Sequence, residues 1–173
     1  MMPWMKGWNR MATLIAVAVS GKVSFTFDSV EEYEEKYEAN LPVEEYEIGF
    51  HDGSQEEAAL FEVVDHRVEE FFEWVDEDTE TLAKLSYYRD VMGERLWKDS
   101  FEDIVRKLED ICIREGNIES YAPELFFECM NVPDNLKPYI DTDAFARDLR
   151  AGGDCVEIEF ADVTYTITNA NSF

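Results

Sequence analysis

The chain has 173 residues, with 40 acidic side chains against 15 Lys and Arg and a formal net charge of -25 at pH 7. This length suits one compact domain or two to three small ones. The acidity excludes a protein that binds bare nucleic acid or an anionic membrane through a basic face. Hydrophobic residues at 46% and aromatic residues at 14% exclude a wholly disordered chain.

Residues 11–27 have two β-favouring stretches around a turn that contains Gly21. The pattern predicts a β-hairpin. The alternative is a secretory signal, because Lys6 and Arg10 precede the short apolar run 11–19. Residues 1–10 are interpreted as a tail, with Met11 as an alternative start. No run reaches the roughly 18 apolar residues that a membrane span needs.

The acidic side chains concentrate in one third of the chain. Residues 28–80 hold 21 acids and only two basic residues, Lys36 and Arg67, a net charge of -19. Aromatic side chains such as Tyr33, Phe61 and Trp74 are interleaved with these acids, so the region is expected to fold rather than form an acidic tail. Salt adaptation and a functional negative surface stay open as explanations.

Helix and strand signals alternate in this acidic region. Ser29 with Glu32 forms a capping-box pattern that predicts a helix over 29–39. Alternation predicts a half-buried strand over 44–50 and a turn over 51–54. Apolar residues at spacings of three and four predict one helix from about Gln55 to Val75. Its other side would carry an acidic stripe: Glu62, Asp65, Glu69, Glu73 and Asp76.

The remaining chain is predicted to be helical and then mixed. Helices are expected over 79–92, 101–113, 118–130 with Pro123 inside, and 141–150, and a final hairpin over 156–160 and 163–167. The fold class is therefore α+β: an elongated chain of small modules. They are an N-terminal β-rich module (11–54), a central helical module (55–115) and a C-terminal α+β module (116–173).

Catalytic and metal-binding patterns are weak. The two histidines, His51 and His66, form no His-Glu-x-x-His motif, and no phosphate-binding or dinucleotide-binding glycine loop exists. Cys112, Cys129 and Cys155 form no Cys-x-x-Cys pair, so free thiols in a reducing cytosol are expected. We therefore expect a protein that is not an enzyme and holds no cofactor or metal.

The charge itself suggests a function. Duplex DNA carries one negative charge per about 1.7 Å of axis, and its binding proteins contact phosphates through Lys and Arg. Carboxylates accept bidentate bonds from Arg as phosphates do. Rows of them on a folded surface would mimic DNA. The expected partner-binding acids are Glu31, Glu34, Glu35, Glu38, Glu44, Glu45, Glu47, Asp52, Glu62, Asp65, Glu69, Glu70, Glu73, Asp76, Glu77, Asp78 and Glu80.

Two segments resemble the ArdA antirestriction proteins. The stretch Val43–Asp52, after the acidic segment 28–37, is similar to their first domain. The stretch Tyr139–Leu149, with residues 132–136 upstream, is similar to their C-terminal signature. The resemblance covers roughly Asp28 to the end. It implies a three-domain, elongated α+β homodimer that binds type I restriction–modification enzymes in place of DNA, in the cytoplasm of a bacterial host, encoded by a phage, plasmid or other mobile element.

One departure concerns the first hairpin. Members of that family follow their first strand with a long loop, whereas here 19–23 forms a short turn. The departure implies a remodelled first domain. It leaves open another target, such as a CRISPR nuclease. A different reading is an acidic module that binds basic proteins, and a third is an enzyme with a carboxylate or thiol site.

Overall fold

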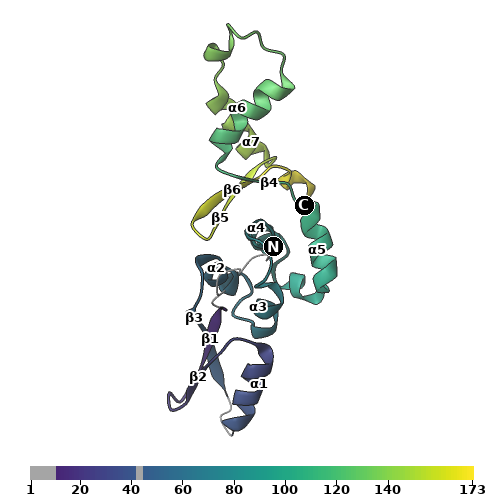
Figure 1. Cartoon of the computed structure of the whole chain (residues 1–173). Coiled ribbons are helices and arrows are strands. Elements are labelled where there is room, and N and C mark those ends of the chain that lie inside the picture. Colours follow the sequence, from purple (N-terminus) through teal and green to yellow (C-terminus); the bar gives the residue numbers. More distant parts are fainter. Residues whose placement is uncertain (1–10, 42–44) are drawn as a thin grey trace, which may run out of the picture. The chain divides into compact units, whose positions relative to one another are not determined.

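The computed structural model describes residues 11–41 and 45–173 and has the predicted α+β class. The chain divides into two compact units, and the boundary along the sequence lies between Glu77 and Asp78. Figure 1 shows their elements in chain order. The predicted division into three modules stays a prediction. The tail of residues 1–10 and Glu44 lie outside the described residues.

The first unit is built on a three-stranded antiparallel sheet of order β2-β1-β3. Its strands are β1 (Thr13–Ala18), β2 (Ser24–Phe27) and β3 (Tyr46–Asp52). The hairpin prediction for 11–27 is confirmed, since β1 pairs with β2 from Leu14↔Phe27 to Val17↔Ser24. The turn predicted over 51–54 begins later, because a register shift lets Asp52 pair with Thr13 and extends β3.

Helix α1 (Val30–Ala39) covers one face of this sheet (Figure 1). Ser29 caps it by accepting a hydrogen bond from the Glu32 backbone N–H at 3.2 Å. The Glu32 carboxylate bonds the N–H of Asp28, at 2.9 Å, so the reciprocal half of the predicted capping box is shifted by one residue. Tyr33 packs against Phe27 with ring centroids 4.8 Å apart and the ring planes inclined at 46°. An aromatic layer therefore joins helix and sheet.

The single helix predicted over 55–75 is wrong. The structure has α2 (Gln55–Val63) and α3 (Val68–Trp74), separated by Asp65 and His66 with φ of 52° and 62°. The N–H of His66 donates to the Phe61 carbonyl at 3.1 Å, a bond that closes a helix end when the next residues turn left-handed. The turn lets α3 pack its Phe71 edge-on against Phe61, with ring centroids 5.7 Å apart.

The second unit begins with α4 (Thr79–Met92), as predicted, and continues through the 3₁₀ turn η1 (Gly93–Lys98) to α5 (Phe101–Glu109). The helix predicted to reach residue 113 ends earlier. Residues Ile113–Glu115 instead form strand β4, whose partner β6 lies some 50 residues further along the chain. Local periodicity cannot show such a pairing.

The rest of this unit follows the predictions closely. Helix α6 (Ile118–Cys129) contains Pro123, and α7 (Thr142–Gly152) begins at the cap Asp141. Strands β5 (Val156–Phe160) and β6 (Val163–Ile167) form the predicted hairpin, in a second sheet of order β4-β6-β5. Short turns η2 (Lys137–Tyr139) and η3 (Ala170–Ser172) complete it. One core cluster between α6 and α7 holds Ile118, Ala122, Ala146, Leu149 and Cys155.

Candidate functional site

Helix α1 presents a row of carboxylates to solvent. Glu31, Glu34, Glu35 and Glu38 are all exposed. Glu31 lies three and four residues before Glu34 and Glu35, and Glu38 lies three and four residues after Glu35 and Glu34, so these pairs are about 4.5–6 Å apart along the axis. The only lysine of this helix is turned away from them. Lys36 donates to Glu32 at 2.6 Å and to the Thr26 carbonyl at 2.7 Å. It therefore fastens α1 to β2 and does not pair with the acidic row.

Two more exposed acids lie at the start of β3. Glu47 is in the strand, and Glu45 immediately precedes it. The Glu45 carbonyl accepts from the N–H of Val19 at 3.2 Å, so the extended pairing continues through Glu45 and the two acids lie about 6.6 Å apart on one side. Asp52, at the end of the strand, is half-buried. The structure therefore makes Glu45 and Glu47 available and gives Asp52 a more restricted position.

The acids of α2 and α3 do not form the continuous stripe that the sequence predicted. The left-handed turn at Asp65 and His66 interrupts it. Glu62, Glu69 and Glu73 are exposed, whereas Asp65 and Glu70 are half-buried. Glu62 and Glu70 have basic side chains as neighbours: Glu62 lies 3.3 Å from His66 Nε2 and Glu70 lies 3.4 Å from Arg67.

The acids around the boundary between the units divide into two kinds. Asp76 is exposed and Glu77 is half-buried. Asp78 caps α4 by accepting hydrogen bonds from the Thr81 N–H and hydroxyl, both at 3.0 Å, and the N–H bond from Thr81 is the main cause that lowers the pKa of Asp78. Glu80 pairs with Lys84 at 3.0 Å. Asp78 and Glu80 therefore have structural roles.

Nine predicted acids have no basic partner within the described part of the chain. Their carboxylates are available for an external cation because no Lys, Arg or His of residues 11–41 and 45–173 neutralises them. They are Glu31, Glu34, Glu35, Glu38, Glu45, Glu47, Glu69, Asp76 and Glu77.

The second unit carries further exposed acids that the prediction missed. Residues 81–173 hold 10 basic residues beside 19 acids, so the net charge of this part of the chain does not single out these acids. These acids differ from the ion-paired acids because they are exposed and have no basic partner among the described residues. Exposed acids without a basic partner among the described residues include Glu102, Glu109, Glu115, Glu128, Asp143, Asp148 and Glu159.

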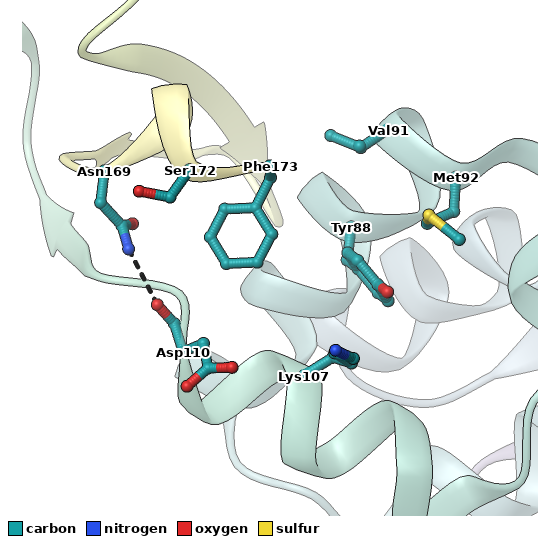
Figure 2. A pocket seen from close by; sticks show the side chains of 8 residues that line it. All are labelled: Tyr88, Val91, Met92, Lys107, Asp110, Asn169, Ser172 and Phe173. Atoms are coloured by element: carbon teal, nitrogen blue, oxygen red, sulfur yellow. Dashed lines mark hydrogen bonds between the residues drawn. The ribbon is translucent and has the colours of Figure 1, made fainter.

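A cavity of about 470 Å³ lies inside the second unit, between α4, α5 and the C-terminal residues. Figure 2 shows its lining, with the Asn169 side chain donating to the Asp110 carbonyl at 2.8 Å. Burial and the charge of Asp99 raise the pKa of Tyr88. Half of the lining side chains are apolar or aromatic, namely Tyr88, Val91, Met92 and Phe173, and half are polar or charged, namely Lys107, Asp110, Asn169 and Ser172.

This cavity does not assemble a recognisable catalytic group. Its described lining contains neither His nor Cys, so it lacks the usual pairing of a nucleophile with a base. Among the described residues, no three His, Cys, Asp or Glu side chains gather as a metal site would require. Cys112 and Cys129 are exposed, whereas burial raises the pKa of the Cys155 thiol.

No helix of the described residues has both the length and the apolar character needed to cross a membrane. No curated protein and no solved structure matches the chain. The family model described as "Antirestriction protein (ArdA)" matches residues 10–162. This match spans both units and most of the chain, and it agrees with the two segments whose resemblance the sequence indicated. The chain therefore belongs to the ArdA family of antirestriction proteins.

Proposed function

We propose that the protein inhibits a type I restriction–modification enzyme by occupying its DNA-binding channel as a mimic of duplex DNA. The observation that carries the proposal is the set of exposed carboxylates on α1 and at the start of β3 that no Lys, Arg or His of the described residues neutralises. A DNA-binding channel is lined with Lys and Arg for phosphate contacts, and these carboxylates offer the same cations equivalent bonds.

The folded scaffold makes such a mimic effective. Carboxylates fixed on a helix and a strand lose less conformational entropy on binding than those of a flexible polyanion. The internal like-charge repulsion costs a few tenths of a kcal/mol for each i,i+4 pair. A cationic channel would relieve that repulsion. We therefore assign the protein an inhibitory role without catalysis, cofactor or direct binding of nucleic acid, acting in the bacterial cytoplasm.

The inhibitor is proposed to act as a homodimer. The supporting observation is an apolar surface around the α6–α7 connection, where the side chain of Tyr139 is 83% exposed and Met130 and Leu136 are about half exposed. Large apolar groups of this kind on a soluble protein often mark a protein–protein contact. Light scattering on the purified chain would give the mass directly, and Tyr139→Ser should shift it toward the monomer.

To identify the target, more than one class of DNA-binding defence enzyme has to be compared. The short connection between β1 and β2 departs from the long loop that the family resemblance implies. Another DNA-handling defence enzyme, such as a CRISPR nuclease, is therefore a second candidate target. In both cases the inhibitor would replace DNA. A general acidic module for basic proteins would bind them without displacing DNA.

The test is the release of labelled duplex DNA from a purified type I methyltransferase core, with a guide-loaded CRISPR nuclease in parallel. The proposal predicts release from the methyltransferase at near-stoichiometric inhibitor. Release from the nuclease alone would retain mimicry and change the target. Retention of DNA by both enzymes at low salt would contradict the proposal, and capture of basic proteins without DNA release would support the acidic module.

A further inference from the structure

The sheet of the first unit has one covered face and one open face. Cross-strand register places Leu14, Phe27 and Phe50 on one side. Helix α1 packs there through Tyr33, and α2 packs there through Phe61, whose ring centroid lies 6.3 Å from that of Phe50. The aromatic contacts of both helices therefore lie on this one face of the sheet.

The opposite face, here called the open face, carries β-branched and small residues beside an acid. It comprises Ile15, Val17, Ser24, Thr26, Glu47 and Gly49. None of these residues is buried in the described structure, and Val17, on the central strand, is 37% exposed. No described helix has an aromatic contact on this side of the sheet.

Charged and apolar groups adjoin on the open face. Val17 stands directly opposite Glu47 in the register of β1 and β3, which places their Cβ atoms about 5 Å apart. Glu45 precedes β3, and its carbonyl accepts from the N–H of Val19 at 3.2 Å. The β1–β3 pairing therefore continues to Glu45, and alternation places it on the same side as Glu47. A Cβ at Gly49 would approach Ile15 Cγ2 to 3.4 Å, so the absence of that side chain leaves one flank of Ile15 accessible.

We propose that the open face is a docking surface for the cationic target protein, in which Val17 and Ile15 bury against apolar groups beside the Lys or Arg that binds Glu45 and Glu47. Charge complementarity selects this occupant, because both acids lack an internal partner among the described residues. A second copy would bring like charges together. The inference rests on the proposed function and adds a contact that a row of phosphates cannot supply.

Substitutions at Val17 that change the charge and the apolar contact in different ways test this inference. Val17→Glu adds a carboxylate, so mimicry by charge alone predicts equal or tighter binding to the methyltransferase core. Docking through the open face predicts binding weaker by about tenfold, the typical loss for one aliphatic side chain excluded from an interface. Val17→Thr keeps the β-branched shape without the charge and should weaken binding by about threefold to tenfold.

Salt gives an independent readout. The affinity ratio between wild type and Val17→Thr should stay constant as salt rises, whereas the ratio for Glu45→Gln with Glu47→Gln should shrink through screening. The matched control is Val156, a valine on β5 of the second unit that is 38% exposed. Val156→Glu and Val156→Thr should leave the affinity unchanged, and thermal melts verify that every variant is folded.

A photoreactive amino acid at position 17 identifies the occupant. In the mixture of full chain and methyltransferase, cross-links to the enzyme support the inference. Cross-links only to residues 1–10 of the same chain or to a second copy overturn it, as does normal affinity of both Val17 variants. If the wild-type chain itself fails to bind the enzyme, the proposed function fails. If it binds while the Val17 variants match it, only the open-face inference fails.

Discussion

At the scale of single residues, two local features of the second unit contribute to its stability: the turn of the β5–β6 hairpin and the N-terminal cap of α4. The β5–β6 hairpin turns through Ala161 and Asp162, both with positive φ, of 50° and 61°, and Phe160 pairs with Val163 on either side. This is the geometry of a two-residue hairpin loop that Asn and Gly adopt most easily. Ala is unfavourable there because its Cβ crowds the following carbonyl.

Ala161→Asn is therefore expected to raise the free energy of unfolding by about 0.5–1 kcal/mol. Urea denaturation measures the change. Ala151→Asn is the control, because Ala151 is exposed near the end of α7 and has no positive φ. It should lower stability slightly through its weaker helix propensity. A loss of stability for Ala161→Asn would show that the turn does not need a left-handed residue.

The cap at Asp78 gives a prediction that depends on pH. Asp78→Ala removes two hydrogen bonds to Thr81 and should lower the free energy of unfolding by about 1 kcal/mol at pH 7. Asp78→Asn should lower it less, because an amide oxygen still caps the helix.

The pKa of Asp78 lies below its ordinary value of 3.8 in the folded state. The charged carboxylate therefore contributes its full stability above pH 3.8 and loses it as the pH falls through the lowered pKa. The cost of Asp78→Ala should shrink over that range. An equal cost at pH 7 and at pH 2.5 would contradict this role for the charge.

At the scale of elements, α1 is fastened to β2 through Lys36, and its exposed glutamates repel one another. Replacing Glu31, Glu34, Glu35 and Glu38 together by Gln removes like-charge pairs, so the free energy of unfolding should rise by about 1 kcal/mol at low salt. The gain should diminish as salt is added. Affinity for the target should fall strongly in the same variant, whereas each single substitution should change it little because the charge is shared.

Paired acids supply the matched control for this block. Replacing Glu62, Glu70 and Glu80 by Gln removes the same kind of charge from carboxylates that have cationic neighbours. These substitutions should leave stability unchanged or lower it slightly, since exposed ion pairs contribute little, and should reduce affinity less than the α1 block. A gain in stability equal to that of the block would show that pairing does not distinguish the two sets.

Elements whose signals are local could be predicted from the sequence. The caps at Ser29 and Asp141 and the alternation over 156–167 lie within a few residues of what they define. The break at Asp65 could not, because apolar spacing continues through it and the turn is favoured by tertiary packing of Phe71 on Phe61. Strand β4 was missed because its pairing, Ile113↔Ile167, joins distant parts of the chain.

For the candidate surface, the sequence predicts the segment that holds the acids but not which of their carboxylates are paired. Composition located the acids in 28–80, but the sequence analysis placed Glu80 among the partner-binding acids, whereas in the structure it pairs with Lys84. The direction of Lys36 toward the Thr26 carbonyl depends on the packing of α1 against β2. The distinction between available and neutralised carboxylates therefore required the structure.

At the scale of the whole molecule, a net charge of -25 is expected to govern association. Attraction between this chain and a cationic channel should weaken steeply as salt rises, since the Debye length falls from about 10 Å at 0.1 M to about 3 Å at 1 M. Titrations of the methyltransferase core at several salt concentrations measure this dependence. If the affinity did not change with salt, this expectation would be contradicted and the binding would be due to apolar contacts alone.

The central claim is that inhibitor and DNA occupy the same channel. The most direct measurement is the apparent dissociation constant of the chain for the methyltransferase core at increasing concentrations of a specific DNA duplex. If the inhibitor and DNA occupy the same channel, this constant rises in proportion to the DNA concentration, as expected for mutually exclusive ligands. A constant that stays level while the enzyme holds both partners, in a ternary complex detected by its mass, would contradict mimicry.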